Sequence, residues 1–238
     1  IKGHESSVIG GPDSGLPLSQ LLAKYGEKIV GKETYQKFGN EFPILIKILD
    51  TRDKLSFQVH PGEELALTRH HSHGKTEMWY VVDSEGDAQI HAGFNRDISF
   101  DEYKRMVEDG SLVNVINCFH PKVGEIYLIE PGTVHAIGAG NLLIEVQQTS
   151  DITYRIFDYN RRDKNGKLRE LHTELACDAI NYSADRNIHL QPVEVRKDTE
   201  LLVNCNCFNV KKIRISGVKN IDLSQRDCFT ILMSIDAD

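Results

Sequence analysis

The sequence predicts a mainly β protein, a double-sheet jelly roll with short helical insertions. Short strand-like segments recur along most of the chain, with turns roughly every ten residues between them. The helix-like segments are few and brief. Histidine, glutamine and glutamate residues stand within the strand-like segments or at their ends, where jelly rolls can carry metal ligands. These three observations together predict the fold class.

The composition limits the function classes. With 238 residues, 40% hydrophobic and 26% charged, the chain is expected to be soluble and globular, as one large domain or one domain and part of a second. The net charge of −7, from 28 basic and 35 acidic residues, disfavours nucleic acid or an anionic membrane as the main partner. No segment approaches the roughly 18 apolar residues of a membrane span, and no basic and apolar leader opens the chain. We therefore expect a cytoplasmic protein.

The five cysteines indicate reduced thiols. Their number is odd and their positions are scattered, without the CxxC spacing of a zinc finger or a redox motif. We expect them to be buried thiols of a cytosolic protein. Cys205 and Cys207 have the same parity within a strand-like segment, so we expect both in the core.

Before residue 55 the pattern predicts one helix and one strand. The helix covers 17–25, where leucines recur at helical spacing after a proline suited to a first turn. We expect this helix to serve packing alone. The strand covers 43–50, an apolar run that Lys47 interrupts.

Residues 55–62 combine a polar and an apolar face in one strand. Successive side chains of a strand point to opposite faces, so Ser56, Gln58 and His60 share one face and the apolar residues between them share the other. One side of the sheet therefore receives three polar side chains.

Two later strand-like segments add similar polar groups. In 75–82, Lys75 and Glu77 share a face. In 127–136, an apolar strand is broken by a Pro-Gly turn that delivers His135. We expect these groups to converge with those of the first strand.

Gln58, His60, Glu77 and His135 form the predicted metal site. Imidazole and carboxylate ligands suit a borderline divalent ion such as zinc. A ligand set that lacks thiolate and leaves a position open to water or substrate is typical of catalytic sites. A single histidine of this set would more often be structural, and the shared placement at strand ends is what favours ligands.

A histidine cluster at His70, His71 and His73 is the rival metal site. It ends a helix-capable segment, 63–73, which is polar and expected to face solvent. Such clusters are more often surface residues than ligands, and no carboxylate stands at ligand spacing. The strand-borne set is therefore preferred.

Arg155 stands among apolar and aromatic neighbours in a predicted strand. One interpretation is a structural cation paired with an acid such as Asp158. The other is a fork for an anionic oxygen, because arginine presents planar bidentate donors and stays charged. The sequence supports the two interpretations about equally.

The remaining pattern adds strands and two helices. Ser99 and Glu102 form a capping box at the start of one helix. The helices are predicted at 99–108 and 168–182, and the further strands at 87–94, 141–149, 152–159, 192–195, 201–216 and 228–235.

Five motifs follow one another along the chain: LSFQVHPG (55–62), GKTEMWYV (74–81), PGTVHAIGAG (131–140), EVQQTSDITYRIFDY (145–159) and RELH (169–172). In their order and in their residues these motifs resemble those of the type I mannose-6-phosphate isomerases (phosphomannose isomerases) of the cupin superfamily. General cupins place HxH and a carboxylate close together. Here Gln58-Val59-His60 replaces HxH and Glu77 comes much later, as in these isomerases.

The resemblance implies a cupin-type jelly roll and one zinc ion per chain, held by the four residues of the predicted site. It implies that Arg155 and Lys75 are catalytic and that Ser56, Lys75 and Arg155 bind substrate. We expect residues 1–182 to form the catalytic cupin domain, with its helical insertions. Residues 183–238 are then expected to be the first part of a second cupin-like β domain.

The reaction implied by the resemblance is the reversible conversion of mannose 6-phosphate to fructose 6-phosphate through a cis-enediol. The partner is a small sugar phosphate, and the assembly is expected to be a monomer or a weak homo-oligomer. A metal ion can polarise sugar oxygens, and a positioned base contributes roughly 10²- to 10⁴-fold, although the sequence does not identify the base.

Two alternatives to the isomerase remain. Two histidines and a carboxylate are also the facial triad of non-haem iron oxygenases, so a cupin dioxygenase is the first alternative. A non-catalytic sugar-phosphate sensor would keep Arg155 and Lys75 while losing metal ligands. Because all four ligand positions are filled, the sensor ranks last.

Overall fold

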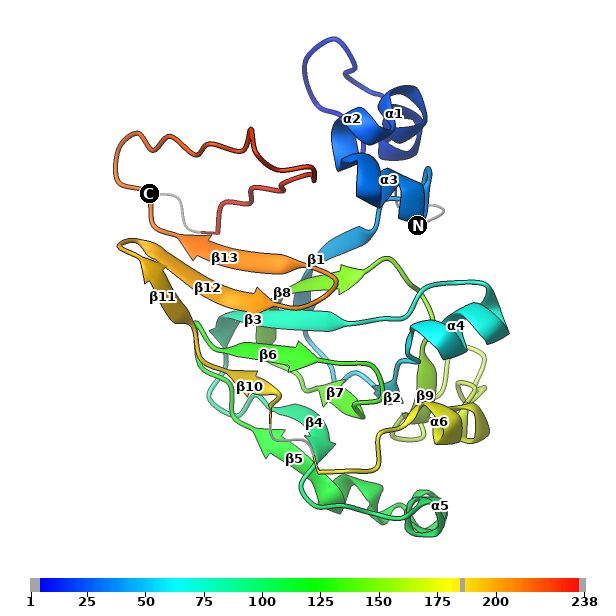
Figure 1. Ribbon diagram of the computed structural model, residues 1–238. Coiled ribbons are helices and arrows are strands. Elements are labelled where there is room, and N and C mark those ends of the chain that lie inside the picture. Colours follow the sequence, from blue (N-terminus) through cyan, green and yellow to red (C-terminus); the bar gives the residue numbers. More distant parts are fainter. Residues whose placement is uncertain (1–4, 185–186, 236–238) are drawn as a thin grey trace. The chain divides into compact units, whose positions relative to one another are not determined.

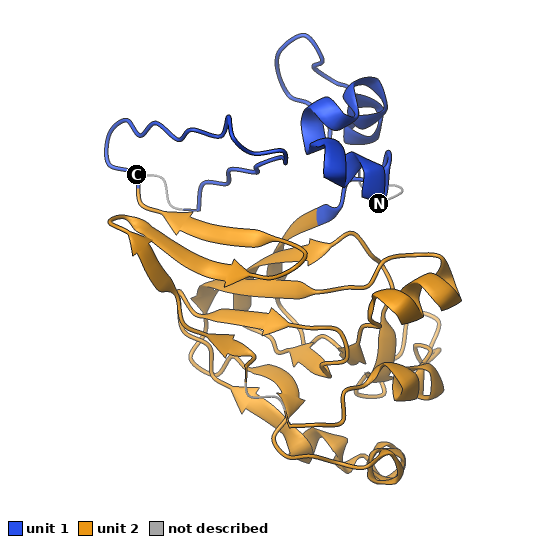
Figure 2. Ribbon diagram, in the orientation of Figure 1, with its two compact units in different colours: residues 1–44, 215–238 blue, residues 45–214 orange. Residues whose placement is uncertain are grey.

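The computed structural model describes residues 5–184 and 187–235, whose elements are drawn in Figure 1. Contacts divide the chain into two compact units, residues 1–44 with 215–238 and residues 45–214 (Figure 2). Among the described residues, no helix has the length and apolar character needed to cross a lipid bilayer.

Two five-stranded sheets make up the body of the larger unit, which confirms the predicted mainly β jelly roll. Neighbouring strands such as β3 and β8, or β4 and β7, run antiparallel. The first sheet has the order β1 (Ile44–Thr51), β8 (Asn141–Gln148), β3 (Glu77–Ser84), β6 (Ile126–Ile129) and β10 (His189–Leu190). The second has the order β5 (Ile116–Phe119), β4 (Ile90–Phe94), β7 (His135–Ile137), β2 (Phe57–Val59) and β9 (Tyr154–Phe157).

An apolar core joins the two sheets. Trp79 and Ile129 of the first sheet belong to the same buried cluster as Ile90 and Ile137 of the second. Fully burying an apolar side chain of this size contributes about 1.5–3 kcal/mol. The ring of Trp79 also meets His135 edge-on, with centroids 5.5 Å apart, so this core extends to the predicted metal site.

A second apolar cluster packs β2 and β9 against helices. Phe57 and Val59 of β2 lie there with Ile156 of β9 and Ala176 of α6 (Thr173–Ala179). Because Gln58 alternates with these two apolar residues, its side chain is directed to the opposite face of the sheet. This is the division of faces predicted for residues 55–62.

Short helices connect the strands of the larger unit. Besides α6 they are α4 (Glu63–His70), α5 (Phe100–Asp109) and the 3₁₀ helix η1 (Ser111–Val115). α5 has the predicted cap, since Ser99 Oγ accepts a hydrogen bond from the backbone N–H of Glu102 at 3.1 Å. Gly110 ends α5 with a φ of 77°, a conformation that favours glycine.

The helix predicted at 168–182 is wrong over much of its length, because α6 alone is helical there. The backbone N–H of His172 donates to the carbonyl oxygen of Arg155 at 2.7 Å. In return, the backbone N–H of Arg155 donates to His172 Nδ1 at 3.1 Å. These two bonds hold the segment before α6 beside β9 and prevent its backbone from closing helical hydrogen bonds.

A separate three-stranded sheet consists of β11 (Val193–Arg196), β12 (Thr199–Asn204) and β13 (Asn209–Ile213). The single strand predicted at 201–216 is therefore a hairpin, whose turn spans 205–208. Cys205 and Cys207 lie in this turn and are partly exposed, so the expectation of core residues on a strand is wrong. Cys118 and Cys228 are exposed, so only Cys177 is the buried thiol that the sequence predicted. That residues 183–238 begin a second cupin-like domain stays a prediction.

The smaller unit contains the helices α1 (Leu18–Tyr25), α2 (Glu27–Val30) and α3 (Lys32–Phe38). α1 is the helix predicted at 17–25, and it buries Leu22. The strand predicted at 228–235 is wrong, because these residues have no strand partner. The segment packs through side chains instead, with the rings of Phe229 and Phe42 4.6 Å apart.

Candidate metal centre

Three buried side chains meet between the two sheets of the larger unit. His60 follows β2, Glu77 begins β3 and His135 begins β7, and each is 1% exposed. Their ligand atoms all lie within 4.8 Å of one another. His60 Nε2 is 3.3 Å from Glu77 Oε1, and His135 Nε2 is 3.8 Å from Glu77 Oε2. The structure thus brings together three of the four predicted ligands from separate strands.

The hydrogen bonds of the two imidazoles leave their Nε2 atoms directed at the carboxylate. His60 Nδ1 donates to the carbonyl oxygen of Ile152, and His135 Nδ1 donates to that of Thr133, both at 2.8 Å. A carbonyl can only accept, so Nδ1 carries the proton in each ring and Nε2 presents a lone pair. Metal-binding histidines are held by outer partners of this kind.

The arrangement fits a bound cation. Two Nε2 lone pairs and a carboxylate are all acceptors, and the neighbouring donors Lys75 and Gln58 reach the two imidazoles and only one oxygen of that carboxylate. Glu77 Oε2 is buried and, within the described part of the chain, has no hydrogen-bond partner. A divalent ion would satisfy this oxygen and both imidazoles.

Gln58 brings its amide to the same group. β2 and β7 pair at Gln58 and His135, and Gln58 Nε2 lies 3.3 Å from His135 Nε2. The amide oxygen of glutamine is a suitable ligand for a borderline divalent ion. The role of Gln58 as the fourth ligand stays a prediction, since the atom that contacts His135 is its amide nitrogen.

Lys75 supplies a positive charge beside the carboxylate. Its Nζ lies 2.8 Å from Glu77 Oε1 and 3.4 Å from His60 Nε2, and its side chain is 8% exposed. Burial alone would raise the pKa of Glu77, but its close interactions with His60 and with the Lys75 ammonium hold that pKa well below its usual range. Burial, helped by His60, lowers the pKa of His135 to about 3. An ionised Glu77 and a neutral His135 are the states that metal binding requires.

Arg155 does not form the ion pair that its structural interpretation requires. Asp158 pairs with Arg161 and, at 3.5 Å, with Arg169. Arg155 Nη1 instead donates to the carbonyl oxygen of Glu170 at 2.9 Å, and its Nε is buried with no partner among the described residues. Burial, with repulsion from Arg169, lowers the pKa of Arg155. This leaves the guanidinium with unused hydrogen-bonding capacity.

Two of the three predicted substrate-binding residues, Arg155 and Ser56, lie on or next to strands of the second sheet. Arg155 pairs with Gln58 across β9 and β2, and directly opposed residues share a face of a sheet. Ser56 immediately precedes β2 and is 4% exposed. The roles of Ser56, Lys75 and Arg155 toward substrate remain predictions.

The structure adds polar residues that the sequence interpretation left out. Gln147 is paired with Glu77 across β8 and β3, and Glu145 is paired with Trp79 two positions further. Glu145 accepts hydrogen bonds from Lys47 Nζ at 2.7 Å and from Trp79 Nε1 at 3.2 Å, and Lys47 also contacts Gln147. The signal available in the sequence was Lys47, a lone cation in an otherwise apolar strand.

The histidine cluster has structural partners. His70 Nε2 lies 2.7 Å from the hydroxyl of Tyr154, and His73 Nδ1 lies 2.8 Å from Glu63 Oε1. Within residues 5–184 and 187–235, only His60, Glu77 and His135 group as three or more metal-binding side chains. The preference for the strand-borne set agrees with this geometry.

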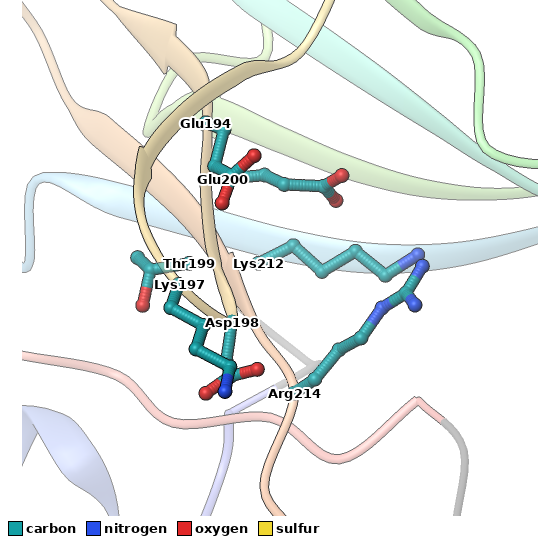
Figure 3. Close-up of a pocket in the computed structure, with 7 residues that line it drawn as sticks. All are labelled: Glu194, Lys197, Asp198, Thr199, Glu200, Lys212 and Arg214. Carbon is teal, nitrogen blue, oxygen red and sulfur yellow. The ribbon is translucent and has the colours of Figure 1, made fainter.

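The three-stranded sheet carries a cavity of about 260 Å³ that is not the metal centre. Figure 3 shows that acidic and basic side chains line it together. The acids are Glu194, Asp198 and Glu200, and the bases are Lys197, Lys212 and Arg214. Balanced charges of this kind favour neither an anionic nor a cationic ligand.

Comparisons with known proteins agree with the motifs and the fold. The family model of the type I phosphomannose isomerase catalytic domain matches residues 3–85. The mannose-6-phosphate isomerase ManA of Bacillus subtilis is 37% identical over 237 residues, which are 98% of this chain and 73% of the relative. A mannose-6-phosphate isomerase of Streptococcus mutans is 37% identical over 89% of this chain and 66% of its own.

A solved structure has the same fold. The crystal structure of the mannose 6-phosphate isomerase from Bacillus subtilis superposes with a TM-score of 0.79 at 33% sequence identity. The match covers 90% of this chain and 67% of that one. The present chain therefore spans about two thirds to three quarters of the relatives that it matches.

Proposed function

Because the chain belongs to the type I phosphomannose isomerase family, we propose that it interconverts mannose 6-phosphate and fructose 6-phosphate through a cis-enediol, with one zinc ion at the buried site. The observation that carries the proposal is the group of His60, Glu77 and His135, whose inward-facing atoms are all acceptors and include an unsatisfied carboxylate oxygen. Gln58 is assigned as the fourth ligand on its contact with His135.

The ligand chemistry favours zinc over harder or softer ions. Two imidazole nitrogens with carboxylate and amide oxygens form a mixed set of intermediate softness, and no thiolate is among them. Three or four protein ligands leave a coordination position for a sugar oxygen. When bound, the metal supplies Lewis-acid polarisation of the sugar oxygens, a contribution of several kcal/mol.

The side chains of the chain itself have three tasks in this reaction. Lys75 holds Glu77 ionised and offers donors near the ligand site for the oxygen on which negative charge develops. Arg155 offers a guanidinium with free capacity for the enediolate or the phosphate. Ser56 immediately precedes the strand that contains Gln58, and there its hydroxyl would orient a sugar hydroxyl.

Proton transfer between the two sugar carbons needs a group that is not a metal ligand. Glu145 is a buried carboxylate on the same sheet as Glu77, and it accepts hydrogen bonds from Lys47 Nζ and Trp79 Nε1. We assign to Glu145 the removal of the proton at C2 of mannose 6-phosphate and its return at C1. The Glu145→Gln variant should then lose turnover by roughly 10²- to 10⁴-fold while retaining its metal.

We further propose a cytoplasmic monomer or weak homo-oligomer. All five cysteines are in the thiol form, as is usual in a reducing compartment. Gel filtration across a range of protein concentrations would measure the assembly directly.

The test is an isomerase assay under anaerobic conditions, with fructose 6-phosphate detected by a coupled enzyme. Turnover without oxygen, lost on treatment with a chelator and restored by zinc, is expected. A dioxygenase would be inactive without oxygen, and a sugar-phosphate sensor would bind substrate without turnover. Either result would refute the proposed reaction.

A further inference from the structure

A pair of thiols occupies the hairpin turn between β12 and β13. The last strand pair before the turn is Asn204 with Asn209, and the backbone N–H of Cys205 donates to the carbonyl oxygen of Phe208 at 3.1 Å. Cys205 and Cys207 therefore sit at the tip of a tight hairpin. Both are partly exposed, so small molecules in solvent can reach them.

The spacing of the pair suits a disulfide. Residues two apart have Cα atoms at most about 7 Å apart, and closer where the chain turns. A disulfide spans Cα distances of about 4.4–6.8 Å. The hydrogen bond between the two side chains places the sulfurs next to each other, so the disulfide can form within the turn.

The environment of Cys205 favours its reactive form. The hydrogen bond between the Cys205 and Cys207 side chains, opposed by burial and by the charge of Glu130, lowers the pKa of Cys205 to about 6. Burial raises the pKa of Cys118 and of Cys177. Cys118 is more exposed than Cys205, so as a control it shows that access alone does not give the reactivity expected of Cys205.

Cys207 also contacts the strand that carries the metal centre. Its Sγ donates to Thr76 Oγ1 at 3.7 Å, and Thr76 lies between Lys75 and Glu77. The backbone N–H of Thr76 donates to Gln148 Oε1 at 2.9 Å, and its carbonyl accepts from the backbone N–H of Gln148 at 3.1 Å. Cys207 therefore contacts the residue that stands between Lys75 and the predicted ligand Glu77, so a chemical change at its sulfur can affect both.

We propose that Cys205 and Cys207 are a redox-active dithiol, which a low-molecular-weight disulfide such as oxidised glutathione converts to a disulfide. The Cys205 thiolate attacks one sulfur of the reagent, which forms a mixed disulfide and releases one glutathione thiolate. Cys207 then loses its proton and attacks Cys205 Sγ, which releases the second glutathione. Two protein thiols are oxidised and one glutathione disulfide is reduced to two thiols.

The disulfide also alters the metal centre. Once oxidised, Cys207 has no S–H to donate to Thr76, so the contact at the start of β3 is lost. We expect slower turnover and faster metal release in the oxidised protein. This coupling rests on the proposed function, whereas the thiol chemistry is independent of it.

The thiol chemistry is tested by counting thiols in the full chain before and after treatment with oxidised glutathione. The five thiols of the reduced protein should fall to three, and digestion should yield a peptide with both Cys205 and Cys207 closed to alkylation. At pH 6, iodoacetamide should react with Cys205 roughly tenfold faster than with an unperturbed thiol, after allowance for the lower nucleophilicity of a low-pKa thiolate.

Variants distinguish this pair from the other thiols. Cys207→Ser should stop at the mixed disulfide on Cys205, and Cys205→Ser should lose most of the reaction, while Cys118→Ser should behave as the wild type. A disulfide that includes Cys118 or Cys228, or equal thiol loss in the Cys205→Ser variant, would overturn the proposal.

The coupling has its own readout. Zinc release to a colorimetric chelator should be at least twofold faster from oxidised than from reduced protein, and dithiothreitol should reverse the change. Cys207→Ser keeps a hydroxyl donor for Thr76, so its release rate should not respond to oxidation. If the disulfide forms and metal release is unchanged, the coupling is wrong. If the protein binds metal but lacks isomerase activity, the proposed function is wrong, whereas the proposed oxidation of Cys205 and Cys207 is unaffected.

Discussion

Replacing Lys75 tests how the buried charges of the metal centre balance one another. Its ammonium and the Glu77 carboxylate are 2.8 Å apart, with side chains 8% and 1% exposed. Lys75→Met leaves Glu77 as an uncompensated buried charge in the metal-free protein. Breaking a buried pair in this way costs about 3–5 kcal/mol of the free energy of unfolding. At about 2–4 °C per kcal/mol for a chain of this size, the melting temperature should fall by roughly 6–20 °C.

The same substitution should strengthen metal binding. A divalent ion beside Glu77 restores the charge balance, so most of the lost stability returns in the metal-loaded variant. Lys75 also repels the ion, and that repulsion disappears with it. By linkage, the metal dissociation constant should fall at least about tenfold, since 1.4 kcal/mol corresponds to a factor of ten.

The assay is thermal unfolding at pH 8 of chelator-treated and zinc-loaded protein, with metal affinity measured by chelator competition. Lys24→Met is the matched control, because its ion pair with Asp13 has nearly the same length, 2.7 Å, but side chains 54% and 17% exposed. That variant should not shift the melting temperature measurably. If metal-free Lys75→Met protein is as stable as wild type, or if the variant binds zinc more weakly, the charge argument is refuted.

Three further predictions follow from the site. Arg155→Ala should lower kcat by roughly 10²- to 10³-fold with fold and zinc retained, and Arg155→Lys should also be impaired because it loses the bidentate fork; a variant with full activity would make Arg155 structural. Replacing His70, His71 and His73 with Asn should leave the metal content unchanged, and a loss of metal would restore that cluster as the site. Because burial depresses the pKa of His135 to about 3, metal-free protein should lose stability as the pH falls from about 6.5 toward 3, where the unfolded chain binds a proton that the folded chain excludes; a flat unfolding free energy across this window would contradict the burial of a neutral imidazole.

Much of the centre could be predicted from strand parity and ligand chemistry. The alternation in residues 55–62 assigns Gln58 to one face and the apolar residues beside it to the other, and the structure has that division. The capping box at Ser99 likewise predicts the start of α5 from local hydrogen bonding alone. Both inferences depend on neighbours in the chain, so the sequence contains them.

The remaining features depend on partners distant in the sequence. Lys47 and Glu145 become neighbours only through the order of β1 and β8 in the sheet, which no local pattern reveals. The segment 228–235 has a strand pattern but no strand to pair with, and a strand needs a partner for its backbone hydrogen bonds. The sequence predicts a strand across residues 205–208, because the alternation of apolar and polar residues does not show where a hairpin turns.

The central claim is that His60, Glu77 and His135 hold a metal ion, and elemental analysis of chelator-free protein tests it most directly. Wild-type protein should contain one divalent ion per chain, chiefly zinc, whereas a His60→Ala variant that melts cooperatively should contain almost none. A wild-type protein with no first-row metal, or a folded His60→Ala variant that retains the full metal content, would contradict the account.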